Sequence, residues 1–240
     1  MSSLIDRLGR TIDYVRLSVT DRCDLRCFYC LPRGFRDFEE PEHWLTFAEI
    51  ERVIAAFARL GTRRVRITGG EPLVRRDGVE DLSLSTNATR LAKHAGDLHA
   101  AGIRRINVSL DSLDAARFRN ITGGRLEKVI DGLMAARAAG FAPIKINMVV
   151  MKGINEDEVE SMVGFCIEHG FTLRLIETMP MGDTGRSATD HYVDLQTVKA
   201  RLARRFELLP GMMPGGGPAR YVQVAGTDLR IGFITPISQH

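Results

Sequence analysis

Residues 64–72 read RVRITGGEP, a short strand in which Val65 and Ile67 alternate with Arg66 and Thr68 before two glycines. Strands of a parallel sheet that is covered on both faces are usually apolar throughout, so this alternation predicts one polar face. The same alternation recurs in four other segments that read as strands, at 14–19, 81–87, 105–111 and 144–151. The chain therefore repeats a strand that is apolar on one side and polar on the other.

Helical patterns separate these strands. Thr46 begins the first helix with Glu49 three residues later as a capping box, and Gly61 ends it. Asn155, with Glu158 three residues on, is expected to cap another helix. Further elements are expected as helices ending near 101, at 126–140, 155–170 and 195–206, a sixth strand at 173–178 and a hairpin of 221–224 with 229–234. Strands that alternate with helices predict a parallel α/β sheet, and an antiparallel sheet with one wet face is the alternative.

The polar strand faces predict a cavity. Helices must cover the apolar faces, so the polar faces look inward, where unpaired polar groups would cost a few kcal/mol each. Four cations are expected there: Arg16, Arg66, Lys145 and Arg174. Such a face needs an anionic ligand, for which a triphosphate, a carboxylate or an iron–sulfur cluster would serve.

One stretch interrupts the alternation. No helical pattern lies between Gly70 and Asp81, although a parallel crossover needs about a dozen residues or more and is usually helical. Either two strands are joined abnormally or a helix is missing from the chain, and we expect the second. Similar losses are expected at Gly123-Gly124 and at the end of the chain.

Three of the four cysteines lie within eight residues, as Cys23, Cys27 and Cys30 in the spacing C-x3-C-x2-C. A disulfide is not expected in a reduced compartment, and a structural zinc site normally has a fourth protein ligand, which is not found nearby. Three thiolates with one open position fit a [4Fe-4S] cluster, and three neighbouring buried thiols are the alternative. Cys166 lies in an apolar helical stripe and is expected in the core.

Composition narrows the class of protein. The 240 residues are 44% hydrophobic, and 33 basic against 30 acidic residues give a net charge of +3, too small to predict a nucleic-acid or anionic-membrane partner. No run approaches the roughly 20 apolar residues of a membrane span, and the first ten residues do not resemble a secretory signal. We therefore expect a cytoplasmic protein.

Together with Tyr29 in the cysteine loop and the GGEP motif at 69–72, the cysteine spacing resembles the radical S-adenosylmethionine superfamily. Within it, the segments at 17–32, 66–76, 105–111 and 232–238 resemble the GTP 3′,8-cyclase family, over about residues 8–239. The resemblance implies an incomplete (β/α)6 barrel of TIM type. We expect the partial barrel at 1–192 and a C-terminal helix and hairpin that close it at 193–240.

The resemblance also implies an activity. The open iron of a [4Fe-4S] cluster would bind S-adenosylmethionine, and an electron from the cluster would free a 5′-deoxyadenosyl radical. That radical would take hydrogen from C3′ of GTP, and the ribose radical would attack C8 to give 3′,8-cyclo-7,8-dihydro-GTP, the first step of molybdenum cofactor biosynthesis. The implied partners are an electron donor protein, a second copy in a homodimer and the downstream cyclic pyranopterin monophosphate synthase, with no nucleic acid or membrane.

Site residues follow from the matched motifs. The resemblance assigns Cys23, Cys27 and Cys30 to the cluster, Tyr29, Gly70, Ser109 and Met179 to S-adenosylmethionine, and Arg16, Arg66, Ser85 and Lys145 to GTP. Each assignment has an ordinary alternative: Met179 could fill the core, the serines could bond locally, and Arg16 and Lys145 could pair with Asp111.

The chain departs from the family in two further places. The family's second [4Fe-4S] cluster uses three cysteines after the Thr-Pro-Ile-Ser segment, which residues 1–240 do not contain, so we expect binding of S-adenosylmethionine but poor turnover of GTP. Ala88 stands where the family usually has glycine, which predicts an altered turn. Two other functions stay open: another radical S-adenosylmethionine enzyme that acts on peptide or RNA, and a non-enzymatic module with zinc at the three cysteines.

Overall fold

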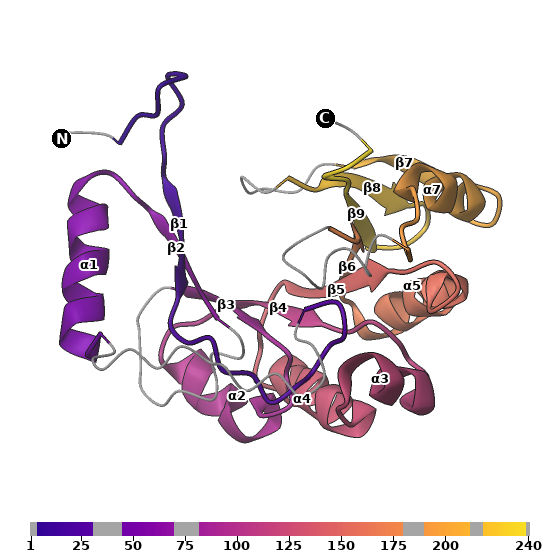
Figure 1. The fold of residues 1–240 in the computed structure, drawn as a ribbon, viewed down its shortest axis with the longest axis horizontal. Coiled ribbons are helices and arrows are strands. Elements are labelled where there is room, and N and C mark those ends of the chain that lie inside the picture. The colour runs from indigo at the N-terminus through magenta and orange to yellow at the C-terminus, as the bar shows by residue number, and fades with distance from the viewer. Residues whose placement is uncertain (1–3, 31–44, 70–81, 180–189, 212–217, 239–240) are drawn as a thin grey trace.

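The computed structural model describes residues 4–30, 45–69, 82–179, 190–211 and 218–238, and its described strands form one nine-stranded sheet (Figure 1). In sheet order the strands are β1 Tyr14–Ser18, β2 Arg64–Thr68, β3 Leu82–Thr86, β4 Arg105–Ser109, β5 Ile144–Val150, β6 Thr172–Glu177, β9 Arg230–Ile234, β8 Arg220–Val224 and β7 Leu208–Gly211. Strands β1 to β6 pair in parallel, which rules out the antiparallel alternative. The order runs from β1 to β7 without closing, so the sheet is an incomplete TIM-type barrel.

Helices cover the sheet on one side. They are α1 Phe47–Arg59, α2 Leu91–Ala100, α3 Ala115–Thr122, α4 Leu126–Ala138, the 3-10 turn η2 Glu156–Glu158, α5 Val159–His169 and α7 Leu195–Ala203. In Figure 1, α2, α3, α4 and α5 lie below the sheet, α1 stands beside β1 and β2, and α7 lies beside the hairpin strands. The expected capping box of Thr46 and Glu49 is present at the start of α1.

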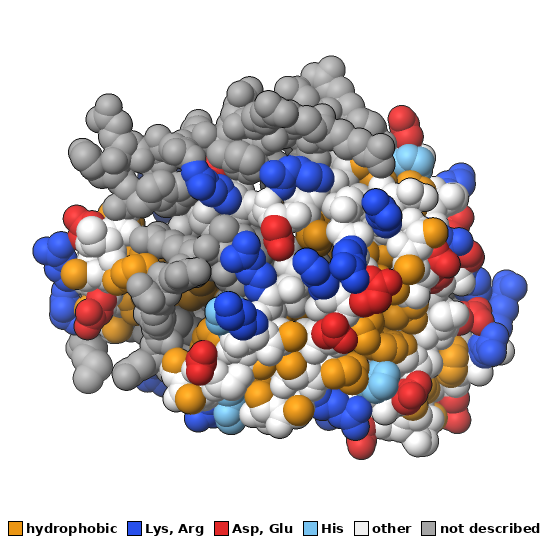
Figure 2. Space-filling model, turned by 90° about the horizontal axis from the view of Figure 1, so that it is seen from below, with side chains coloured by type: hydrophobic (Ala, Val, Ile, Leu, Met, Phe, Trp, Pro, Cys, Tyr) orange, Lys and Arg blue, Asp and Glu red, His pale blue; other side chains and the backbone are white. Residues whose placement is uncertain are grey.

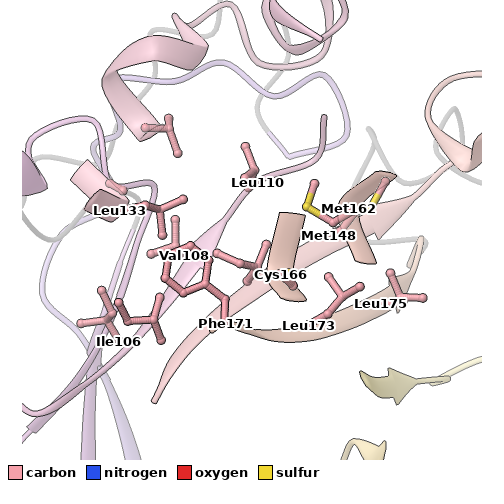
Figure 3. Packing of buried hydrophobic residues seen from close by; sticks show 14 of the residues in the cluster. Ile106, Val108, Leu110, Leu133, Met148, Met162, Cys166, Phe171, Leu173 and Leu175 are labelled. Carbon is pink, nitrogen blue, oxygen red and sulfur yellow. The ribbon is translucent and has the colours of Figure 1, made fainter. Parts of the chain in front are cut away.

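The core confirms that the apolar strand faces are the ones covered by helices. Ile106 and Val108 of β4 and Met148 of β5 are fully buried, as is Cys166 of α5. Figure 3 shows these side chains packed with Met162 and Phe171. Burying an aliphatic side chain of this size contributes about 1.5–3 kcal/mol, so each side chain of this layer stabilises the sheet substantially.

Helix α3 was not expected, because half of its residues are polar and its apolar periodicity is weak. Asp114 caps it by accepting the Arg117 amide at 2.7 Å, and Gly123 ends it in the left-handed conformation with φ 72°. A Cβ on Gly124 would stand 2.4 Å from Cδ2 of Leu25. One glycine therefore ends α3 and the other makes room for the cysteine loop, and the loss expected at this pair stays a prediction.

Asn155 does not cap a helix as expected. Its Oδ1 accepts the Met151 amide at 2.7 Å, and its Nδ2 donates to the carbonyls of Asp111 and Val149 at 2.7 and 2.9 Å. The Asn155 side chain is fully buried, and it supplies hydrogen bonds to three backbone groups that would otherwise be unpaired in the interior. Asn155 thus ties the ends of β4 and β5 together.

Ala88 keeps the turn that glycine would favour, with φ 62° and no exposed surface. The left-handed conformation strains an alanine by roughly 1 kcal/mol. Its carbonyl lies under Gly132 of α4, where a Cβ would stand only 2.3 Å from the oxygen. The small residue on α4 therefore lets the turn after β3 approach the helix.

The C-terminal hairpin is confirmed and extends further than expected. β8 pairs with β9 in antiparallel fashion, but β9 also pairs in parallel with β6, so the sheet runs without a break across the boundary expected at 192/193. β7 was missed because its segment LLPG contains a proline, which suits an edge strand. β2 and β3 pair directly, and the connection in which a missing helix was expected lies outside the described residues.

Surface charge is mixed. Figure 2 shows Lys and Arg side chains interspersed with Asp and Glu on the face seen from below, in keeping with the small net charge. Among the helices that the structure describes, none is both long enough and apolar enough to cross a membrane.

Candidate functional site

The cysteine loop starts directly after β1 and is fixed to the end of β3. Asn87 donates to Oδ1 of Asp24 at 2.7 Å, and the Thr89 hydroxyl donates to Oδ2 of the same carboxylate at 2.6 Å. Asn87 Nδ2 also lies 3.7 Å from the sulfur of Cys23, and the Leu25 amide donates to that sulfur at 3.4 Å. Hydrogen bonds of this kind to a ligand sulfur help to set the reduction potential of an iron–sulfur cluster.

The loop is also docked on α3. The amides of Arg26 and Phe28 donate to the carbonyls of Thr122 and Ile121 at 2.7 and 3.1 Å, which satisfies two of the carbonyls left open at the end of a helix. Leu25 is buried against Gly124. Contacts with α3 and Gly124 therefore fix the backbone of the loop without any metal–sulfur bond.

The three cysteines lie together on this loop. Cys23 and Cys27 are half-buried and Cys30 is exposed, and the Cys30 amide donates to the Cys27 carbonyl at 2.9 Å. Burial raises the pKa of the Cys27 thiol, and the neighbouring Asp111, Cys30 and Cys23 raise it further, whereas burial alone raises the pKa of Cys30. A metal cation would reverse this and deprotonate the thiols.

No three His, Cys, Asp or Glu side chains within the described residues gather around one point as ligands of a single ion do. A [4Fe-4S] cluster takes each thiolate on a different iron, so its ligands do not have to converge in that way. The donor set of three thiolates, with amide hydrogen bonds already aimed at the sulfur of Cys23, fits such a cluster.

Tyr29 connects the loop to the sheet. Its hydroxyl donates to Oδ2 of Asp111, which follows β4, and Oδ1 of that carboxylate accepts the Val149 amide at 2.9 Å. Asp111 is only 2% exposed, and burial raises its pKa to about 6 although both hydrogen bonds oppose the shift. The alternative that Asp111 neutralises Arg16 or Lys145 is therefore wrong, since the described partners of its carboxylate are Tyr29 and Val149.

The residues predicted for S-adenosylmethionine lie at the carboxyl ends of the parallel strands, as far as they are described. Ser109 ends β4 and is exposed, two residues before Asp111. Met179 follows β6 and is 41% exposed, which excludes a core role. Gly70 lies outside the described residues. Its neighbour Gly69 is needed for backbone packing, because a Cβ there would stand 2.4 Å from the Thr20 carbonyl oxygen.

The residues predicted for GTP share one polar face of the sheet. Arg16 and Arg66 are register partners on β1 and β2, and Asn107 of β4 lies between Ser85 and Lys145. Asn107 Nδ2 lies 3.4 Å from the Ser85 hydroxyl. The structure thus brings these four predicted residues to one surface, opposite the helix-covered core.

This face is strongly cationic. Burial lowers the pKa of Lys145 to about 8, and the nearby charges of Arg174, Arg66 and Arg105 lower it further. Burial also lowers the pKa of Arg66. None of the ion pairs formed within the described residues places a carboxylate on these groups. An anionic ligand is what such a face lacks.

Two residues of this face were missed by the sequence reading. The alternation of β4 predicts that Asn107 lies on the polar face, but it does not predict which residue Asn107 contacts. Tyr221 lies on β8 and carries no local signal, although the glycine opposite it, Gly232, indicates a close approach inside a strand. Arg174, which the alternation places inward, is confirmed there at 9% exposure.

Comparison with known proteins decides the family. The model of the Radical SAM superfamily matches residues 17–166, and the model of Molybdenum Cofactor Synthesis C matches residues 171–240. The GTP 3',8-cyclase of Bradyrhizobium diazoefficiens is 47% identical over 255 aligned residues, which cover 100% of this chain and 74% of the relative. The chain belongs to the GTP 3′,8-cyclase family. The enzyme of the same name from Hydrogenovibrio crunogenus is 46% identical over 99% of this chain and 77% of its own length.

The family alignment also bears on the missing helix. It is 255 positions long with the Bradyrhizobium relative, whereas this chain has 240 residues, so at least 15 positions of the relative have no counterpart here. A shortage of this size is large enough for a crossover helix, and its place between Gly70 and Asp81 stays a prediction.

Solved structures support the fold of this GTP 3′,8-cyclase family member. Streptococcus suis SuiB bound to S-adenosylmethionine aligns with a TM-score of 0.61 at 18% identity, over 92% of this chain and 50% of that protein. TYW1 with a lysine-pyruvate adduct aligns with a TM-score of 0.52 at 14% identity, over 88% of this chain and 76% of that one. The radical S-adenosylmethionine family implies a [4Fe-4S] cluster and S-adenosylmethionine as cofactors.

Proposed function

We propose that this chain converts GTP into 3′,8-cyclo-7,8-dihydro-GTP, the first step of molybdenum cofactor biosynthesis. Relatives that align with 99–100% of this chain are named GTP 3′,8-cyclase. The observation that carries the proposal is the polar face of the sheet. Arg16, Arg66 and Lys145 meet there without a carboxylate partner among the described residues, at a surface suited to a triphosphate.

Cys23, Cys27 and Cys30 would hold the [4Fe-4S] cluster. When bound, the cluster and S-adenosylmethionine supply the radical that removes hydrogen from the ribose of GTP. Tyr29, held by Asp111, gives the cofactor a fixed wall on the cysteine loop, and Ser109 offers a hydroxyl at the end of β4. Family motifs add Gly70 and Met179 to this cofactor site.

GTP would lie along the polar face. Arg66 offers planar donors to phosphate oxygens, and Lys145, whose pKa is lowered to about 8, still offers a positive charge at neutral pH. Ser85 of β3 lies opposite Asn107, which is in turn the register partner of Lys145. On the other side of the sheet, the apolar layer packed under α4 and α5 supports the strands that carry these polar side chains.

The second [4Fe-4S] cluster of the family is part of the proposal only in outline. Residues 1–240 hold one cysteine beyond the first three, Cys166, and that thiol is fully buried in the core. Residues 1–240 therefore offer it no ligand. The proposal also includes an electron donor protein, a homodimer and cyclic pyranopterin monophosphate synthase as the enzyme that takes the product.

The decisive experiment uses anaerobically reconstituted protein with S-adenosylmethionine, GTP and dithionite. The expected result is 5′-deoxyadenosine together with a cyclised GTP derivative, separated by chromatography and identified by mass. We expect clear S-adenosylmethionine binding, and formation of the cyclised product only when GTP is supplied. Formation of 5′-deoxyadenosine that depends on an added peptide or RNA, and not on GTP, would instead support a different radical S-adenosylmethionine enzyme.

A further inference from the structure

Arg174 is the most enclosed cation of the polar face. It lies on β6 with 9% of its surface exposed, and its described partners are neutral. Nε donates to the Tyr221 hydroxyl at 2.8 Å and Nη1 donates to Oδ1 of Asn107 at 3.0 Å. A guanidinium has five N–H donors, so these two bonds fix its plane and leave other donors for a ligand. Within the described part of the chain, these neutral partners leave its charge uncompensated.

Tyr221 reaches Arg174 because of a glycine. Arg174 of β6 is the register partner of Gly232 on β9, and Gly232 is in turn the partner of Tyr221 on β8. The three residues form one row across three strands. A Cβ on Gly232 would stand 2.7 Å from Cε1 of the Tyr221 ring. The absence of a side chain in the middle of the row thus lets the ring lie across β9 and present its hydroxyl to β6.

Asn107 completes the arrangement from the other side. Its Oδ1 accepts from Arg174, while its Nδ2 donates to the Leu84 carbonyl at 3.3 Å and lies 3.4 Å from the Ser85 hydroxyl. Because the Leu84 carbonyl can only accept and the guanidinium can only donate, the two together settle which amide atom of Asn107 faces Arg174. Hydrogen bonds thus run from β3 through β4 and β6 to β8, and Arg174 stands in the middle of them.

We propose that Tyr221 is a positioning residue for GTP: its hydroxyl holds Arg174 so that the unused edge of the guanidinium faces the triphosphate. This inference rests on the proposed function and deepens it, since it brings the C-terminal hairpin into the substrate site. Fixing a long cationic side chain before the ligand arrives removes part of the ordering cost of binding. A carboxylate in place of the hydroxyl would fix Arg174 equally well but would cancel its charge.

The test compares Tyr221→Phe, which removes one hydroxyl, with Tyr192→Phe as a matched control whose hydroxyl makes a long 3.4 Å contact to Glu177. Calorimetric titration of the reconstituted protein uses three probes: GTP, inorganic tripolyphosphate and guanosine. We expect Tyr221→Phe to weaken GTP and tripolyphosphate binding about 5- to 10-fold and to leave guanosine binding unchanged. In turnover assays KM for GTP should rise while kcat changes little. Tyr192→Phe should match the wild type.

A second variant, Gly232→Ala, tests the same row through sterics, since the added methyl must displace the tyrosine ring. It should weaken tripolyphosphate binding at least as much as Tyr221→Phe. Equal losses for tripolyphosphate and guanosine in Tyr221→Phe would show a general structural defect and overturn the proposal. Unchanged tripolyphosphate binding would overturn it too, while GTP turnover by the wild type would leave the proposed function standing. A third outcome separates the two proposals. If Tyr221→Phe loses tripolyphosphate binding but the wild type makes no product from GTP, the role of Tyr221 is supported and the proposed function is contradicted.

Discussion

Replacing Lys145 with methionine should make the chain more stable while it loses affinity for GTP. Burial and the neighbouring arginines lower the pKa of Lys145 from 10.5 to about 8. A shift of this size corresponds to about 3 kcal/mol, and contact with water reduces the destabilisation to about 1–2 kcal/mol. Methionine keeps the length of the side chain and removes the charge. For a chain of this size the gain corresponds to a rise in Tm of about 3–6 °C.

The pH dependence gives the sign of this effect. Between pH 8 and pH 10.5 the unfolded chain binds more protons at this site than the folded chain, so the stability of the wild type rises with pH. The advantage of Lys145→Met should therefore be full below pH 8 and vanish above pH 10.5. Thermal melts without nucleotide measure it, with Lys128→Met on the exposed face of α4 as the control.

With GTP present the order should reverse, because the variant lacks a charge-assisted bond to phosphate and binds GTP at least about 10-fold more weakly. A variant that melts no higher than the wild type at pH 7, or whose advantage persists at pH 10.5, would refute the electrostatic account of this face. Unchanged GTP affinity would show that the triphosphate does not reach Lys145.

Three other changes, the first with a control variant, test the site and its support. Cys27→Ala should abolish the brown colour and the iron and sulfide content of anaerobically isolated protein. Cys166→Ala should keep the colour and the iron, and should lose about 1 kcal/mol of stability in urea titrations. Equal iron content in the two variants would place the cluster elsewhere. Asn155→Ala leaves three buried backbone groups unpaired and should cost about 2–4 kcal/mol, and a smaller loss in urea denaturation would mean that water replaces the amide. Gly132→Ala improves helix propensity, yet it should destabilise by about 1–3 kcal/mol because the methyl meets the Ala88 carbonyl; a higher Tm would show that the turn can move away.

The alternating strands could be predicted because each repeats the same local signal. Val65 and Ile67 on one side and Arg66 on the other define faces without knowledge of the partner strands, and the helices between strands then fix a parallel order. The three cysteines of the loop were found for the same reason, since a metal-binding spacing is local in sequence. Helix α3 was missed because Phe118 and Ile121 alone give too weak a periodicity.

Partners that meet only in the folded chain could not be predicted. The pairing of Tyr29 with Asp111 spans 82 residues, and that of Arg174 with Tyr221 spans 47. Nothing in the sequence around Asp111 distinguishes a carboxylate that anchors a tyrosine from one that neutralises a lysine. The role of Asn155 was misread because a strand-end asparagine and a helix cap look alike until the backbone groups around them are placed.

The way the cysteine loop is fastened has a consequence for how the protein acquires its iron. Leu25 is wedged against Gly124, two loop amides are taken by α3, and Asp24 is gripped by the turn after β3, all without any metal–sulfur bond. The loop is therefore already folded when the cluster binds, unlike small zinc domains that fold only when the ion is bound. Chelators should strip such a protein to a colourless, still folded form that cellular cluster-loading machinery can fill again.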